Sequence, residues 1–217
     1  MSGAKQPVWD LPVRLFHWLL AGLICLSWWT AKNDALEIHL YSGYAILSLI
    51  IFRVLWGVFG SSTAQFRNFV HRPSAVIAYI RDGRAWKAIG HSPLSALSVL
   101  AILVVLKLQV ATGLLNADDD GLTEGPLSAK VSQATVDFAH EAHDWLFKLL
   151  LTLIALHIAA ILFYHLVQKK NLVGPMVTGK AEVDPAAEPM RPGKYWVALL
   201  CLAAAIATTR VLIALGG

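Results

Sequence analysis

Charged residues are scarce in this chain of 217 residues. Asp, Glu, Lys and Arg together make up 15% of it and 57% is hydrophobic, whereas a soluble domain averages about 25% charged residues. A soluble protein of this size has one core at most and must cover that core with polar surface. The composition therefore argues against a soluble enzyme and favours the lipid bilayer as the solvent.

Cysteine is scarce as well, since the chain has only Cys25 and Cys201. Two cysteines cannot build a disulfide framework, a zinc site or the Cys-x-x-Cys-His attachment of a c-type haem. Hydrogen oxidation by this chain alone is excluded too, because a nickel–iron centre needs more cysteines. Any cofactor must therefore be held without covalent bonds to cysteine.

Five apolar stretches are long enough to cross a bilayer, which takes about 20 residues per helix. They cover residues 15–31, 38–58, 93–115, 145–167 and 195–215. We predict an all-α integral membrane protein with a four-helix transmembrane bundle in residues 1–180, a linker over 181–194 and a fifth C-terminal transmembrane helix. The first stretch lacks a small-residue cleavage site and carries His17, so we expect it to be retained as a span.

The basic residues predict the orientation, because Lys and Arg concentrate on the cytoplasmic side. With a cytoplasmic N-terminus, 13 of the 18 basic residues fall on the cytoplasmic side. The opposite loop carries Asp118, Asp119, Asp120 and Glu124. We therefore expect the N-terminus in the cytoplasm and the C-terminus outside, with the bilayer as a partner and no nucleic acid.

The loop over residues 60–90 is long and basic. Within it, residues 74–89 mix apolar side chains with Arg81, Arg84 and Lys87 after Pro73. This pattern predicts a short helix that lies on the cytoplasmic surface of the membrane.

Four of the eight histidines lie within or at the edge of the apolar stretches: His17, His39, His143 and His157. A polar side chain in lipid is costly and usually faces the bundle interior. For any single one of them, a hydrogen bond to a neighbouring helix is the alternative explanation. Four together indicate a shared function.

The spacing of these histidines predicts two pairs. His143 and His157 are 14 residues apart, which places them roughly 21 Å apart along a helix and within about 40° of the same face. The directions of the spans then put His17 at the depth of His157 and His39 at the depth of His143. Paired imidazoles without Cys or carboxylate ligands suit the axial positions of porphyrin iron better than zinc.

Other residues near these histidines are candidates for contact with the cofactor. Gly22 and Gly43 would leave room for a porphyrin plane, or they serve close helix packing. Arg53 and Arg14 lie at the depth of His17 and His157 and could bind a haem propionate, or they anchor helix ends on the cytoplasmic side. Lys107 lies inside the third span. There it either snorkels outward, pairs with a propionate of a haem at the depth of His39 and His143, or meets a carboxylate.

A series of short motifs occurs in order along the chain: D-L-P-V-R-L-F-H-W at residues 10–18, His39 with Gly43, Arg53 and Trp56-Gly57, G-H-S-P at 90–93, A-T-G at 111–113, A-H-D at 142–144, L-H-I-A-A at 156–160 with His165, and N-L-V at 171–173 followed by Met176 and Gly179-Lys180. Together they resemble the bacterial cytochrome b561 family, which includes the cytochrome b subunit of nickel–iron hydrogenases. The resemblance covers about residues 8–180. The fifth span departs from the family's core pattern.

This resemblance implies a four-helix bundle that encloses two non-covalent b-type haems, with His17, His39, His143 and His157 as bis-His ligands. It also implies a multi-pass protein of the bacterial inner membrane that relays electrons between the quinone pool and a redox partner. The partner would be a hydrogenase-like enzyme or a periplasmic cytochrome c, which the acidic residues 118–120 could steer. We expect no catalytic residues in the usual sense.

Two other functions compete with this one. The chain could be a haem-bearing membrane anchor subunit of a redox complex. A non-redox proton or metal channel would need polar spans, and few Ser, Thr, Asn or Gln residues lie in suitable places.

Overall fold

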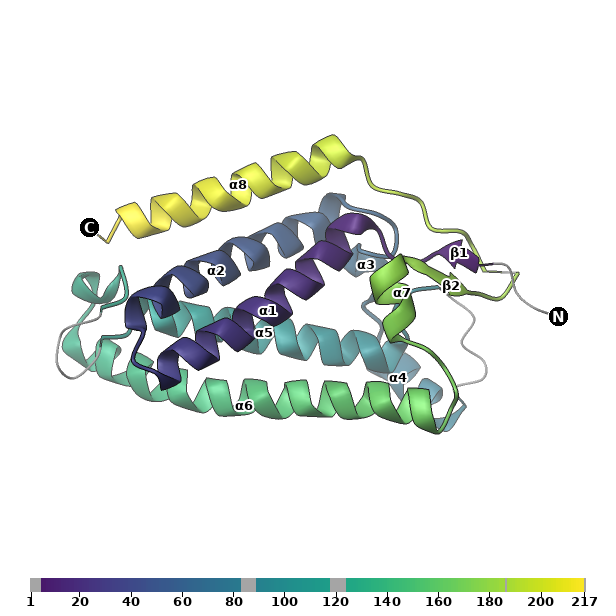
Figure 1. The fold of residues 1–217 in the computed structure, drawn as a ribbon, viewed down its shortest axis with the longest axis horizontal. Helices are drawn as coiled ribbons and strands as arrows, with labels where there is room; N and C mark the ends of the chain where they lie inside the picture. The colour runs from purple at the N-terminus through teal and green to yellow at the C-terminus, as the bar shows by residue number, and fades with distance from the viewer. Residues whose placement is uncertain (1–4, 83–88, 118–123, 186, 217) are drawn as a thin grey trace. The chain divides into compact units, whose positions relative to one another are not determined.

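The computed structural model describes residues 5–82, 89–117, 124–185 and 187–216. Five of its helices are long and apolar enough to cross a membrane (Figure 1). They are α1 (Leu11–Lys32), α2 (Leu36–Phe59), α5 (Pro93–Leu115), α6 (Gln133–Leu166) and α8 (Tyr195–Ala214). The predicted all-α integral membrane fold with a fifth C-terminal span is therefore confirmed.

Short elements connect these helices. They are β1 (Lys5–Pro7), α3 (Phe66–Phe69), α4 (Pro73–Arg81), the 3₁₀ helix η2 (Ser128–Lys130), α7 (Val173–Thr178) and β2 (Lys180–Glu182). The strands β1 and β2 pair antiparallel, with Gln6 opposite Ala181. This pair was not predicted, because three residues per strand are too few for a periodic pattern.

The helix α4 begins one residue before the predicted surface helix of residues 74–89 and covers its first half. Its side chains Ile77 and Ile80 are exposed, as a helix that rests on a membrane surface requires. Residues 83–88 of that prediction, and the acidic residues 118–120, lie outside the described residues.

Three helices begin earlier than the apolar stretches, and the difference is largest for α1 and α6, since α2 begins only two residues earlier. The helix α1 starts at Leu11 because Asp10 caps it, accepting a hydrogen bond from the backbone N–H of Val13 at 2.8 Å. The helix α6 starts at Gln133 instead of residue 145. Its first three turns are amphipathic, and a search for continuous apolar residues does not detect such turns.

The chain divides into two compact units. Unit 1 comprises residues 1–16, 53–101 and 153–199, and unit 2 comprises residues 17–52, 102–152 and 200–217. Both units are assembled from segments that are distant in the sequence.

Unit 1 is built around Trp56, whose side chain is fully buried. Its Nε1–H donates to the Asp10 carboxylate at 3.0 Å, so the residue that caps α1 also satisfies the buried indole. The Arg53 side chain is buried beside it and donates to the Ala64 carbonyl at 3.2 Å. The guanidinium carbon also lies 4.8 Å from the centre of the Phe66 ring, a cation–π distance.

Unit 2 contains the contact that holds the fifth span. Small residues on one face of α8 are buried, namely Cys201, Ala205 and Thr209. The Ser48 hydroxyl of α2 donates to the Thr209 hydroxyl oxygen at 2.9 Å. A hydrogen bond between two hydroxyls and a face of small residues is a typical contact between helices in lipid.

In unit 1, His91 lies between two aromatic rings. Its ring centre is 4.7 Å from that of Trp9 and 4.8 Å from that of Phe69. Burial lowers the pKa of His91 to about 3, and the positive charge of Arg53 acts in the same direction. The folded protein therefore holds this imidazole in its neutral form at neutral pH.

We expect His91 to make the fold less stable in acid. Between its ordinary pKa of 6.5 and its folded value of about 3, the unfolded chain binds a proton that the folded chain does not, so the free energy of unfolding falls as the pH falls. This loss is at most about 1.4 kcal/mol per pH unit. Thermal unfolding in detergent at pH 7 and pH 5 should show a smaller difference for His91→Gln than for the unchanged protein, and an equal difference would contradict the assignment.

Candidate functional site

Unit 2 contains a cavity of about 420 Å³ whose walls come from α1, α2, α5 and α6. This volume lies within the range of small-molecule binding sites in proteins. The cavity is lined by both His39 and His143, so the fold brings one of the two predicted pairs together.

The two imidazoles are spaced as the two ligands of a single metal would be. Their ring centres are 6.3 Å apart and their planes are inclined at 76°. Two imidazole–metal bonds of about 2 Å each, together with the ring radii, add up to roughly this distance. A tetrahedral zinc site would need four protein or solvent ligands, whereas a porphyrin supplies four of iron's six ligands and leaves two for the protein.

The protein fixes which nitrogen of each ring is available. His39 Nδ1–H donates to the Ser27 carbonyl of α1 at 2.9 Å. His143 Nδ1 lies 3.2 Å from the Thr112 hydroxyl oxygen, and this hydroxyl donates its own hydrogen to the carbonyls of Leu108 and Gln109. Thr112 must therefore accept from His143, which leaves Nε2 of both rings as the nitrogen that can bind a metal.

Two glycines give the cavity its room. A Cβ atom at Gly43 would meet nothing within 4 Å, and a Cβ at Gly113 would lie 3.0 Å from Cε1 of His143. Both residues line the cavity. Gly43 was predicted to leave space for a porphyrin, and Gly113 is a wall residue that the spacing of the histidines did not single out.

The cavity lining is apolar on one part and polar on another. Its apolar part includes the side chains of Ile24, Ile46, Leu106, Phe147 and Leu150. Its polar part includes Lys32, Asn116, His140 and Asp144, among which His140 Nδ1 bonds the Asn116 amide oxygen at 3.0 Å. Lys32 is the last residue of α1, Asn116 directly follows α5, and His140 and Asp144 flank His143 on α6. Haem has the same division, with an apolar macrocycle and two carboxylates, so the residues present fit this group.

A lysine other than Lys107 lines the cavity. Lys107 is exposed on α5 and does not line the cavity, whereas Lys32 in the last turn of α1 does. Among the described residues, Lys32 supplies the only lysine or arginine in the cavity wall. Lys32 was not predicted as a site residue. It lies four residues before the next helix, and a lysine at the end of a span is usually only an anchor at the membrane surface.

The other predicted site residues lie elsewhere. A Cβ at Gly22 would meet nothing within 4 Å, and Gly22 is not part of the cavity wall. Arg53 is engaged with Ala64 and Phe66 in unit 1, and Arg14 donates to the Val177 carbonyl there. Contact of either arginine with a propionate stays a prediction.

The second predicted pair is divided between the units. His17 belongs to unit 2, where its ring packs edge to face on Trp18 with centres 4.9 Å apart. His157 belongs to unit 1 and lies on α6, as His143 does. The pairing of His17 with His157 stays a prediction.

Five membrane spans and a pair of facing imidazoles in an apolar cavity define an integral membrane protein that is equipped to hold a metal cofactor. A family model described as prokaryotic cytochrome b561 matches residues 8–179, so the chain belongs to the prokaryotic cytochrome b561 family. Membership makes it a membrane b-type cytochrome that binds haem and takes part in electron transfer. A comparison with individually curated proteins found no match.

If His39 and His143 hold a haem in this cavity, Gly43→Ala should perturb it. The added methyl group points into open space in the cavity, so it should leave the fold intact and compete with the porphyrin. Visible spectra of the purified protein should show that haem lost or shifted. Gly22→Ala is the matched control, because its Cβ is also uncrowded but lies outside this cavity; an identical spectral change in both variants would count against the assignment.

Lys32→Gln should lower the reduction potential of a haem bound in this cavity, because a nearby cation stabilises the form that has gained an electron. Lys107→Gln makes the same chemical change on the same unit but outside the cavity wall, so it should leave that potential unchanged. Redox titration of both variants decides between the two lysines. Equal shifts, or a shift for Lys107 alone, would show that the polar part of the cavity is not the propionate end.

Proposed function

We propose that this chain holds two b-type haems in series and relays electrons across the bacterial inner membrane between the quinone pool and a redox partner. The spacing of His39 and His143, with ring centres 6.3 Å apart, is the observation that carries the proposal. It supports bis-His ligation of one haem inside unit 2. When bound, haem supplies an iron that is reversibly reduced by one electron.

The residues around His39 and His143 would control this haem. The Ser27 carbonyl and the Thr112 hydroxyl hold the two rings through Nδ1, which fixes their orientation and makes Nε2 a stronger donor. Strong imidazole donors stabilise ferric iron, whereas the charge of Lys32 favours ferrous iron. The potential of the haem would result from the balance of these two effects.

The second haem is proposed for His17 and His157. His143 and His157 are 14 residues apart on the continuous helix α6, which corresponds to roughly 21 Å along its axis. Two haems at these levels would carry an electron through most of the apolar core of a bilayer, which is about 30 Å thick. A single haem would leave a much longer gap.

The direction of the chain in the membrane is also a proposal. Residues 53–90 and 169–194, which adjoin the ends of the spans, are rich in basic residues. This concentration favours the cytoplasmic side for both segments. The N-terminus would then be cytoplasmic, the C-terminus periplasmic, and the His39 and His143 site nearest the periplasm. A periplasmic cytochrome c or a hydrogenase-like enzyme would exchange electrons on that side.

A haem-bearing anchor is the other candidate, and it shares the same haem sites. The two functions differ in the behaviour of the chain alone. A relay should be reduced by a quinol analogue when the partner protein has been removed, whereas an anchor should not. Failure of a quinol analogue to reduce either haem in purified protein would remove the quinone from the proposal.

Substitution of the four histidines tests the pairing directly. We expect His39→Ala and His143→Ala to lose the same haem, because each removes one of its two axial ligands, and His17→Ala and His157→Ala to lose the other one. Reduced-minus-oxidised spectra with a haem-to-protein ratio measure this outcome. His140→Ala is the control, since His140 lines the same cavity but bonds Asn116; it should keep both haems. Loss of one haem by His39→Ala and of the other by His143→Ala would contradict the pairing.

A further inference from the structure

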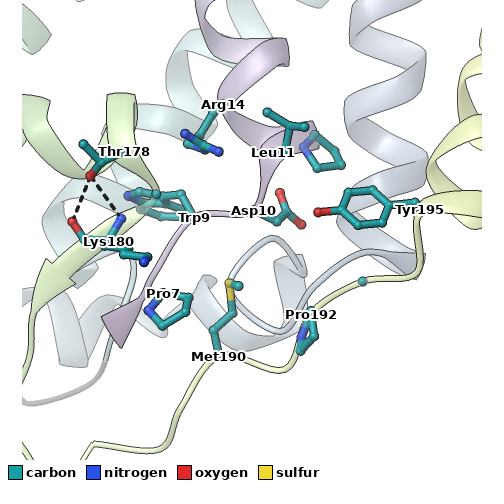
Figure 2. A pocket seen from close by; sticks show the side chains of 13 residues that line it. Pro7, Trp9, Asp10, Leu11, Arg14, Thr178, Lys180, Met190, Pro192 and Tyr195 are labelled. Carbon is teal, nitrogen blue, oxygen red and sulfur yellow. Dashed lines mark hydrogen bonds between the residues drawn. The ribbon is translucent and has the colours of Figure 1, made fainter. Parts of the chain in front are cut away.

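Unit 1 contains a small surface pocket that shares no lining residue with the histidine cavity. It has a volume of about 180 Å³ and is formed by three separate segments of the chain, residues 7–14, 178–180 and 190–195 (Figure 2). Its wall combines aromatic, cationic and apolar side chains, including Trp9, Arg14, Lys180, Met190 and Tyr195. Of the residues predicted to contact haem, Arg14 alone lines this pocket, and its side chain donates to the Val177 carbonyl.

The pocket is firmly built. The backbone N–H groups of Val8 and Trp9 both donate to the Gly179 carbonyl, at 2.8 and 3.1 Å. Gly179 has a φ of +82°, and a Cβ there would lie 2.8 Å from the Trp9 carbonyl oxygen, so only glycine fits this close approach. On the other side, Arg191 and Ser62 exchange two hydrogen bonds of 3.0 Å.

The charges of the pocket favour an anion. Arg14 and Lys180 contribute two positive charges and Asp10 contributes one negative charge. Both Asp10 oxygens already accept hydrogen bonds, one from the Val13 backbone and one from Trp56. The pocket therefore has a net charge of about +1, and the lone pairs of its one carboxylate are partly occupied. A single phosphodiester group, with one negative charge, would neutralise the net positive charge of the pocket.

Two transmembrane helices begin at this pocket. Leu11 is the first residue of α1, Tyr195 is the first residue of α8, and both line the wall. Figure 2 shows the Tyr195 hydroxyl directed toward Asp10 across the pocket. Leu15 and Leu199, one turn further along each helix, are exposed apolar residues at 52% and 67%. The pocket therefore lies where the polar headgroups of a bilayer meet its hydrocarbon, next to Trp and Tyr side chains that prefer this level.

We propose that this pocket binds the phosphate of an anionic glycerophospholipid. Lys180 and Arg14 attract the phosphate, Trp9 and Tyr195 flank the headgroup, and the acyl chains follow the exposed first turns of α1 and α8. A free phosphate ion would satisfy the same charges but would leave these apolar turns without a ligand. The bound lipid would join the N-terminal strand, β2 and the start of the fifth span at one point.

Native mass spectrometry of the full-length protein tests this proposal. The protein is released from nanodiscs of phosphatidylcholine with increasing phosphatidylglycerol, and the bound lipids are counted. We expect one phosphatidylglycerol to be retained in preference to phosphatidylcholine. Lys180→Gln should weaken this retention about fivefold, the usual effect of one basic residue near an anionic membrane. Lys170→Gln is the matched control, because Lys170 is an exposed lysine of the same unit outside the pocket.

The possible outcomes separate the sources of the phosphate. Equal retention of the two lipids, or equal losses in Lys180→Gln and Lys170→Gln, would overturn the proposal. Displacement of the lipid by millimolar inorganic phosphate would show an anion site with no need for the acyl chains, and would also overturn the assignment to a lipid. The haem spectrum of each variant, compared with that of the unchanged protein, shows whether the variant is folded. Absence of haem from the unchanged protein would bear on the proposed function without affecting its lipid count.

Discussion

The structure depends on the burial of imidazoles inside helices that lie in lipid. A polar side chain in the hydrocarbon core is costly unless it has partners. The imidazoles of His39 and His143 have partners on two sides. On one side of each ring, Nδ1 bonds Ser27 or Thr112. Both histidines line a cavity that a metal cofactor would fill, and Nε2 is the nitrogen of each ring that is left to bind it. Gly43 and Gly113 keep that cavity open, and the polar residues at its edge match the carboxylates of haem.

The histidine cavity of unit 2 and the surface pocket of unit 1 are built from different kinds of secondary structure. The histidine cavity of unit 2 is held by four long helices, whose registers set the positions of the ligands. The pocket of unit 1 is held by short strands, a left-handed glycine and a capping carboxylate. Asp10 connects these features, because it begins the first span, satisfies the buried Trp56 and balances the charge of the surface pocket.

Much of this organisation could be predicted from the sequence. Long apolar stretches are strong signals, so the five spans were predicted, and helix periodicity placed His39 and His143 at one depth. The lysines could not be assigned in the same way, since the rotation of α5 that exposes Lys107 depends on packing against neighbouring helices. Three features join residues that are more than 60 apart in the sequence: the pairing of β1 with β2, the contact of Trp9 with His91, and the surface pocket. No local pattern encodes such contacts.

The proposed relay requires paired imidazoles that hold two haems in this chain. Electron paramagnetic resonance of the oxidised, purified protein, together with a haem-to-protein ratio, tests this requirement. We expect two haems per chain and only low-spin ferric signals, because both axial positions of each iron would be occupied by strong nitrogen ligands. A ratio near one, or a high-spin signal from an iron with an open axial position, would contradict it.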